Sequence, residues 1–125
     1  MTASRRAVAA AVARQRGHFT AEALAAALPN VGRATVYRTL KILTEAGVLC
    51  RVLMDDGSLH YRLSGPGHHH HLVCVGCGAI QDFADSVVER VVSQLARAGS
   101  FTVEGHWLEV YGRCAGCSTA PSAAR

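Results

Sequence analysis

The sequence predicts an α+β fold in two parts, and three observations support this prediction. Helical periodicity runs from residue 4 to residue 46 and is followed by two alternating segments around Asp56-Gly57, a pattern typical of three helices and a β-hairpin. A row of four histidines leads into a strand-like segment near the middle of the chain. Two Cys-x-x-Cys motifs enclose one further helical pattern, which indicates a small mixed unit closed by a metal ion.

The first half of the chain is expected to form helix, helix, turn, helix and hairpin in that order. The first helix spans residues 4–14, and Thr20 is the expected N-cap of the second, in FTAEALAAAL. The third spans residues 33–46 and ends at Gly47, because glycine suits the left-handed turn that follows a helix. This order is that of a winged helix, which places its recognition helix in the major groove of DNA.

Basic and aromatic side chains occupy the outer face of the third helix. Val36 and Leu40 recur on the opposite face, so they are expected to point into the core. The alternative is a three-helix unit for protein contacts, with arginines that are merely solvated. The predicted DNA contacts are Arg33, Thr35, Tyr37, Arg38 and Lys41, together with Arg5 and Arg6 of the first helix.

Charge and length narrow the functional classes. The first 65 residues carry nine Lys and Arg against four Asp and Glu, whereas the remaining residues carry four against five. The basic half therefore suits a polyanion such as double-stranded DNA. No segment reaches the length of a membrane span, and the start MTASRRAVAAAVA is interpreted as an amphipathic helix rather than an export signal. A cytoplasmic location is expected, where cysteines serve as metal ligands more often than as disulfides.

Four of the five cysteines form the motifs CVGC and CAGC, with 36 residues between them. A single Cys-x-x-Cys also occurs in redox dithiols or by chance. Two such motifs in one chain supply the four thiolates of a tetrahedral structural Zn²⁺ site, so the predicted ligands are Cys74, Cys77, Cys114 and Cys117. Such a site contributes to the free energy of folding, because the metal cross-link is absent from the unfolded chain.

The histidine row, His68 to His71, precedes the strand-like segment LVCV. Alternate side chains of a strand point to opposite faces, so His68 and His70 share one face while His69 and His71 share the other. Each face then offers half of a metal site, which predicts two sites separate from the cysteines. A solvated turn that binds metal only weakly is the alternative interpretation.

The remainder of the second half is predicted to be strand, helix and strand. GAIQDF has the pattern of a strand, SVVERVVSQLARAG that of a helix, and FTVEGHWLEVYGRC that of a strand pair or one long strand bent at Gly105. A unit of about 50 residues buries little apolar surface, so dimerisation through its sheet is expected. The tail STAPSAAR, residues 118–125, is expected to be disordered.

Three motifs, ATVYRTL in the third helix, HHHHLVCVGCG and YGRCAGC, carry a resemblance to the Fur family of bacterial metal-sensing repressors over about residues 2–117. The resemblance implies a winged-helix DNA-binding domain at residues 1–64, a hinge at 65–67 and a metal-binding α/β dimerisation domain at 68–117. It also implies a homodimer that closes on palindromic operator DNA when a regulatory metal binds. No membrane partner or small-molecule substrate is expected.

The resemblance also implies metal ligands, one residue at a time. The four paired cysteines match the family's structural zinc site, and Tyr37 and Arg38 match its base-contacting pair. His18, at the start of the second helix, matches a sensor ligand from the winged helix. The full set of implied sensor ligands is His18, Cys50, His69, His71 and Asp82, and a further site is implied at His68, His70, Glu89 and His106.

Two departures from the family pattern bear on the sensed metal. Iron-sensing members usually place Glu directly after an aromatic residue ahead of the histidines, whereas here Arg62 follows Tyr61, and a cation cannot ligate a metal. Cys50 lies in the first wing strand, where zinc-sensing members carry a ligand; a core cysteine is the alternative. Thiolate with imidazole favours Zn²⁺ over Fe²⁺ or Mn²⁺, so Zn²⁺ is the predicted regulatory metal.

Three other functions stay open at this point. One is an iron-, manganese- or peroxide-sensing regulator of the same family, and a peroxide sensor would use an oxygen-rich iron site with His69, His71 and Asp82. A zinc metalloenzyme needs an open metal position beside a base such as Glu89 or Glu104, but no helical His-Glu-x-x-His or nucleophile pattern is present, so an enzyme is not expected. A metal buffer would bind metal without any coupling to DNA.

Overall fold

The computed structural model describes residues 2–64, 69–83 and 86–118, and the chain divides into two compact units, Met1–Gly67 and His68–Arg125. The expected hinge at 65–67, His68 and residues 119–125 of the expected tail lie outside the described residues. The mixture of helices and strands confirms the predicted α+β class. Within the described ranges, no helix combines the length and apolar character that crossing a membrane requires.

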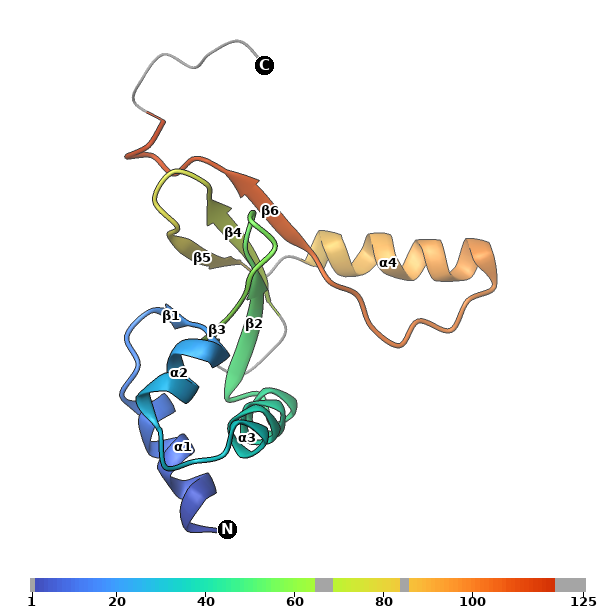
Figure 1. Cartoon of the computed structure of the whole chain (residues 1–125). Helices are drawn as coiled ribbons and strands as arrows, with labels where there is room; N and C mark the ends of the chain where they lie inside the picture. Colours follow the sequence, from blue (N-terminus) through green and yellow to red (C-terminus); the bar gives the residue numbers. More distant parts are fainter. Residues whose placement is uncertain (1, 65–68, 84–85, 119–125) are drawn as a thin grey trace. The chain divides into compact units, whose positions relative to one another are not determined.

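In the N-terminal unit, residues 2–64 form three helices and a three-stranded antiparallel sheet (Figure 1). Its elements are α1 (Ala3–Ala13), β1 (His18–Phe19), α2 (Ala21–Ala27), α3 (Arg33–Glu45), β2 (Leu49–Leu53) and β3 (Leu59–Leu63). The strand order is β1-β3-β2, and β2 pairs with β3 across the predicted turn, where Gly57 has a φ of 88°. These helices and this hairpin have the predicted winged-helix order.

The predicted ends of two helices have identifiable caps. At the start of α2, Thr20 Oγ1 accepts a hydrogen bond from the backbone N–H of Ala23 at 3.1 Å. At the end of α3, Gly47 has a φ of 82°, a left-handed conformation that costs glycine little. The backbone N–H of Val48 then reaches the carbonyl of Leu43 at 2.9 Å and satisfies one of the last helical acceptors.

A short strand that the sequence did not predict, β1, places one of the expected sensor ligands. Its two residues pair with β3, His18 opposite Arg62 and Phe19 opposite Tyr61. His18, expected at the start of the second helix, thus lies in a strand just before the N-cap Thr20, because pairing with β3 holds it in extended backbone. Phe19 and Tyr61 stack at a ring-centroid distance of 5.9 Å and anchor this strand to the core.

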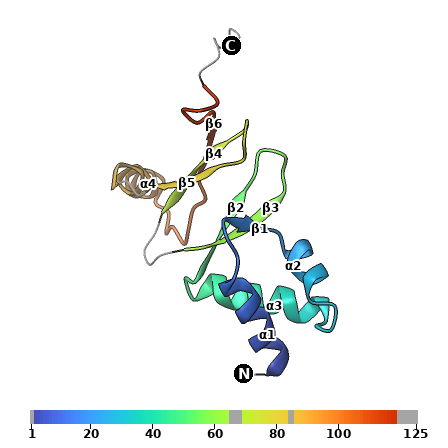
Figure 2. The same ribbon diagram turned by 90° about the vertical axis from the view of Figure 1, so that its left-hand side faces the viewer.

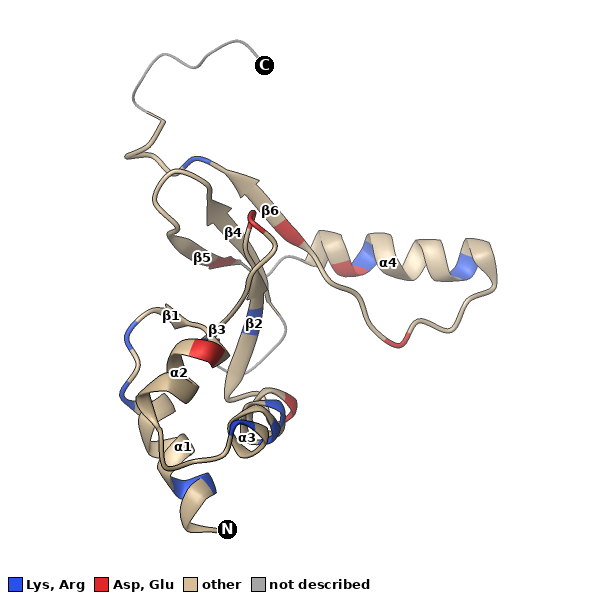
Figure 3. Cartoon of the chain, viewed as in Figure 1, with Lys and Arg blue, Asp and Glu red and all other residues tan. Residues whose placement is uncertain are grey.

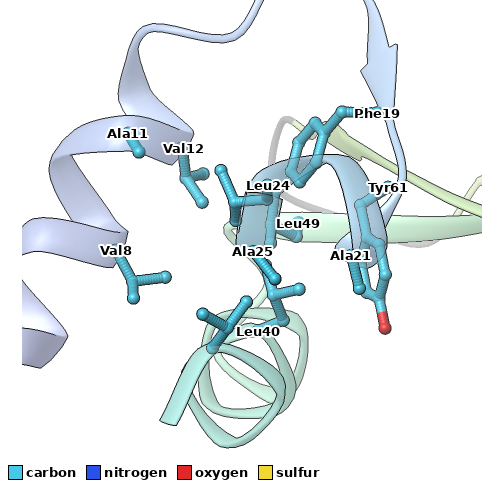
Figure 4. Packing of buried hydrophobic residues seen from close by; sticks show 11 residues of the cluster. Val8, Ala11, Val12, Phe19, Ala21, Leu24, Ala25, Leu40, Leu49 and Tyr61 are labelled. Atoms are coloured by element: carbon cyan, nitrogen blue, oxygen red, sulfur yellow. The ribbon is translucent and has the colours of Figure 1, made fainter. Parts of the chain in front are cut away.

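The core of the N-terminal unit holds α3 in a fixed orientation. Figure 4 shows Val8 and Val12 of α1 beside Leu24 of α2 and Leu40 of α3. Val8, Val36 and Leu40 have no exposed surface, and burial of each such side chain contributes about 1.5–3 kcal/mol to folding. Because Val36 and Leu40 point inward as predicted, the opposite face of α3 is presented to solvent.

The described residues of the C-terminal unit form a mixed three-stranded sheet and one helix (Figure 2). Its elements are β4 (His70–Cys74), β5 (Ile80–Phe83), α4 (Ser86–Gly99) and β6 (Glu109–Gly112). The strand order is β5-β4-β6, with β4 antiparallel to β5 and parallel to β6. Of the segment FTVEGHWLEVYGRC, expected to be a strand pair or one long bent strand, residues 109–112 form β6, whereas residues 101–108 form no strand, so the prediction is wrong for that part. A strand needs a hydrogen-bonded neighbour, and residues 101–108 pair with none of the described strands of this sheet.

Candidate metal centres and nucleic-acid interface

The turn after β4 and the segment after β6 bring the four paired cysteines together. Their sulfur atoms all lie within 4.8 Å of one another, and the Sγ atoms of Cys77 and Cys114 are 3.7 Å apart. Four sulfurs at about 2.3 Å from a tetrahedral Zn²⁺ would be about 3.8 Å from each other. The cluster therefore fits this ion with little rearrangement.

Backbone groups and neighbouring thiols set the ionisation of this cysteine cluster. The backbone N–H groups of Cys114 and Cys77 donate to Cys74 Sγ at 3.3 and 3.4 Å, and these bonds lower the pKa of the Cys74 thiol to about 6. Hydrogen bonds that the Cys117 thiol donates to the other sulfurs, that to Cys114 first, raise the pKa of Cys117 to about 12. Four thiols this close resist ionising together unless a cation neutralises them, which is how a metal–thiolate site behaves.

One glycine of the two Cys-x-x-Cys motifs is required by close packing. A Cβ added at Gly76, in CVGC, would lie 2.9 Å from Cys117 Sγ and 3.1 Å from Cys117 Cβ. A Cβ added at Gly116, the same position in CAGC, would meet only Cys114 Sγ at 4.0 Å, an ordinary contact. The first motif therefore needs glycine for steric reasons, whereas the second does not.

A second candidate centre surrounds His71 in the middle of the C-terminal sheet. Its neighbours in register are Asp82 on β5 and Glu109 on β6. Nδ1 of His71 lies 2.8 Å from Glu109 Oε1, and Nε2 lies 3.7 Å from Asp82 Oδ1. The ring of His69 meets that of His71 edge-on at a centroid distance of 5.5 Å. The structure thus brings together three of the expected sensor residues and adds a buried carboxylate, Glu109, which the sequence analysis did not select.

A third candidate centre lies around His70, the next residue of β4. Nε2 of His70 is 3.4 Å from Glu89 Oε1, and Nε2 of His106 is 3.7 Å from Glu89 Oε2. One ligand atom from each of these three residues lies within 4.8 Å of the others. His70 and His71 therefore face different clusters, as the alternation of side chains along a strand predicts. His68, the fourth residue expected here, lies outside the described residues.

The two remaining sensor candidates lie in the N-terminal unit. Cys50 is half-buried in β2 and pairs in register with Arg62 of β3. Nδ1 of His18 lies 2.7 Å from Nδ1 of His60, a residue that the sequence analysis also missed. His60 and Glu109 share a signal that could have revealed them, since each is a titratable residue within a short, largely apolar strand segment, SLHYRL or HWLEVYG.

The outer face of α3 is the candidate nucleic-acid interface, and Figure 3 shows its Lys and Arg residues in blue. Arg33, Tyr37, Arg38 and Lys41 are exposed, as is Arg6 of α1, whereas Arg5 and Thr35 are half-buried. The guanidinium of Arg33 lies 5.8 Å from the centroid of the Tyr37 ring. The Tyr37 hydroxyl donates to Glu22 Oε2 at 2.9 Å, which raises the pKa of Tyr37. The face therefore offers cations and an aromatic hydroxyl, with one carboxylate at its border.

Comparison with known proteins points to one family over most of the chain. The model of the ferric uptake regulator family matches residues 1–111. A ferric uptake regulation protein of Campylobacter upsaliensis is 37% identical over 107 residues, which cover 81% of this chain and 69% of that protein. The structure of the Vibrio cholerae ferric uptake regulator is 33% identical, covers 91% of both chains and has a TM-score of 0.63. A zinc uptake regulator complexed with zinc and DNA is 28% identical over 93% of this chain and 81% of that one, with a TM-score of 0.74.

Proposed function

The chain belongs to the ferric uptake regulator family and is a metal-responsive DNA-binding regulator, and on this premise we propose that it is a zinc-dependent repressor. In this proposal a homodimer in the cytoplasm binds palindromic operator DNA when its sensor site holds Zn²⁺. The relatives named above are regulators, not enzymes, so no catalytic step is needed.

The observation that carries the choice of zinc is the pairing of Cys50 with Arg62 across β2 and β3. The wing sheet presents a thiol and a guanidinium here, and a guanidinium cannot ligate a cation. A thiol combined with imidazole ligands favours Zn²⁺, whereas Fe²⁺ and Mn²⁺ prefer sets richer in oxygen. We therefore keep His18, Cys50, His69, His71 and Asp82 as the proposed sensor ligands.

DNA binding is assigned to the exposed face of α3. Arg33 and Lys41 suit phosphate contacts, and Tyr37 and Arg38 suit base edges in the major groove, because their side chains leave the helix on the solvent side. A zinc uptake regulator with the same fold was solved with DNA, which supports this assignment. In the proposal, sensor metal favours the conformation that binds DNA, and the coupling must be reciprocal, typically about 1–3 kcal/mol.

The cysteine cluster is proposed to hold a structural Zn²⁺. The separation of the sulfurs fits a tetrahedral thiolate site, and when bound the ion supplies a cross-link between the turn after β4 and the end of β6. This role differs from sensing because the site has four protein ligands and no open position. Removing one ligand, as in Cys77→Ser, should unfold the C-terminal unit or abolish its assembly, not merely alter regulation.

The homodimer is proposed to form through the C-terminal unit. α4 has no buried residue in the described chain, and Val87, Val91 and Leu95 are 49%, 47% and 67% exposed along one face of it. Phe101 and Trp107, in the segment that follows, are 74% and 51% exposed. Apolar surface of this extent marks an interaction site in a soluble protein, and a second copy of the chain would supply the matching surface.

The proposal is tested by fluorescence anisotropy on DNA from upstream of the gene. The protein is treated with a mild chelator that leaves the cysteine cluster filled, and Zn²⁺, Mn²⁺ and anaerobic Fe²⁺ are then titrated as buffered free ions. The expected result is saturable binding at far lower free Zn²⁺ than the other ions require, with the Zn²⁺ response weakened in Cys50→Ser. Equal metal affinity with and without operator would contradict the coupling.

A second candidate is an iron- or manganese-responsive regulator of the same family. It is favoured by the two carboxylates beside His71, Asp82 and Glu109, which make that region richer in oxygen than a typical zinc site. A response to Fe²⁺ or Mn²⁺ at lower free concentration than Zn²⁺, unchanged in Cys50→Ser, would establish it.

A further inference from the structure

Two imidazole rings of the N-terminal unit meet on the face of the sheet opposite the core. His18 on β1 is in register with Arg62 on β3, so His60, two residues earlier, lies diagonally across on the same face. The next residue of each strand, Phe19 after His18 and Tyr61 after His60, points into the core, and these two residues are 6% and 9% exposed. Nδ1 of His18 and Nδ1 of His60 are 2.7 Å apart, and the ring centroids are 4.8 Å apart.

A short chain of hydrogen bonds fixes the tautomer of His60. The Ser58 hydroxyl donates to Asp56 Oδ1 at 2.6 Å, and this uses its only hydrogen. Ser58 Oγ therefore accepts from Nε2 of His60 at 3.1 Å, so the hydrogen of the neutral ring is on Nε2. The lone pair of His60 is then on Nδ1, the atom that faces His18, and His18 must donate from its own Nδ1.

The surroundings also hold the ring of His60 in place. It is half-buried, and Ser58 Oγ contacts its Nε2 at 3.1 Å. The Ser58–Asp56 relay resembles the outer hydrogen-bonding shell that commonly orients a metal-ligating histidine. A ring whose lone pair is held toward a second imidazole is already arranged as a metal ligand.

We propose that His60 and His18 together ligate one divalent transition-metal ion through their Nδ1 atoms, which makes His60 a sensor ligand. This inference rests on the proposed function, because it adds a residue to the sensor site. Two nitrogens at about 2.0–2.1 Å from a tetrahedral ion are about 3.3 Å apart, so side-chain rotation must widen the present separation by about 0.6 Å. On binding, the hydrogen of His18 moves from Nδ1 to Nε2, and the ion takes the place of the shared hydrogen.

The test uses the full-length protein with its cysteine cluster filled with Zn²⁺ and its histidines labelled with ¹⁵N. Long-range ¹H–¹⁵N correlation spectra are recorded before and after one further equivalent of Zn²⁺ per chain. The expected result is that Nδ1 of both His18 and His60 moves to the shift of a metal-bound nitrogen. Metal binding that shifts other histidines and leaves Nδ1 of His60 unchanged would overturn the proposal.

Variants give an independent readout through Zn²⁺ affinity measured by chelator competition. His60→Ala and His18→Ala should each weaken sensor binding more than about tenfold, and the double variant should lose little more because either change breaks the chelate. Ser58→Ala keeps both imidazoles and should cause a smaller loss. Zinc content of the cysteine cluster and the melting temperature of each variant without sensor metal show whether the fold is intact.

The outcome separates this inference from the proposed function. If His60→Ala keeps the affinity for sensor Zn²⁺ and the zinc response on DNA, His60 is not a ligand and the zinc-dependent repressor stands. If Zn²⁺ binds through His60 but leaves DNA affinity unchanged, metal ligation by His60 stands, whereas its sensor role and the proposed function fail.

Discussion

Glu109 holds the ring of His71 from the side opposite Asp82. A carboxylate oxygen of Glu109 lies 2.8 Å from Nδ1 of His71, and the side chains of the two residues are only 3% and 6% exposed. A carboxylate accepts, so Nδ1 carries the hydrogen and the lone pair of His71 lies on Nε2, 3.7 Å from Asp82 Oδ1. A buried carboxylate that fixes the tautomer of a histidine in this way orients the ring as a metal ligand.

Glu109→Gln should therefore weaken sensor-metal binding by roughly tenfold, because a neutral amide orients the ring of His71 less firmly and lacks the negative charge of the carboxylate. Chelator competition with the cysteine cluster filled measures the effect. Glu104→Gln, an exposed carboxylate in the preceding segment, is the matched control and should leave the affinity unchanged. Equal affinities for Glu109→Gln and the unaltered protein would show that His71 does not need this partner.

Gly76→Ala should reduce zinc retention by the cysteine cluster, whereas Gly116→Ala should not. The added methyl group at residue 76 would meet Cys117 Sγ at 2.9 Å and displace a ligand, while the methyl group at residue 116 has space. We expect at least about a tenfold lower zinc affinity for Gly76→Ala, the effect typical of a disturbed ligand shell. Zinc content after dialysis against graded chelator gives the comparison, and equal retention by the two variants would contradict the steric account.

Glu22→Gln should tighten DNA binding, because Glu22 accepts the hydroxyl hydrogen of Tyr37 and places a negative charge at the border of the DNA-contacting face. Removing that charge should raise affinity on the order of threefold at low salt, and the gain should fade as salt rises. Glu45→Gln, at the far end of α3, makes the same charge change without the tyrosine contact. A gain of the same size in both variants would assign the effect to net charge alone.

Features with a local pattern or a motif were predictable from the sequence, whereas contacts that depend only on the register of distant strands were not. The separation of His70 from His71 follows from the two-residue period of a strand, which neighbouring residues determine. The approach of Glu109 to His71 depends on the register of β6 against β4, between residues far apart in sequence. Likewise His18 meets His60 only because β1, a strand of two residues with no periodicity to detect, pairs with β3.

The same reasoning explains why the strand predicted at residues 101–108 does not form. Their alternating apolar residues resemble a strand, but alternation shows only that one face would be apolar, not that a partner strand exists. Phe101 and Val103 remain 74% and 41% exposed in the single chain. Their pattern is more consistent with a segment that contacts another copy of the protein than with one buried in its own unit.

Leu95→Glu should dissociate the proposed homodimer. Leu95 is the most exposed of the apolar residues on its face of α4, and a two-fold interface would remove this side chain twice. Each lost leucine contributes about 2 kcal/mol when fully buried, so the dimer dissociation constant should rise at least about 100-fold. Sedimentation velocity across a protein dilution series measures it, with Gln94→Glu as the control, since residue 94 is polar and exposed on the neighbouring face. Dissociation of the dimer should also abolish metal-dependent DNA binding. If Leu95→Glu remained as dimeric as Gln94→Glu and still bound DNA, the interface would have to lie on another surface.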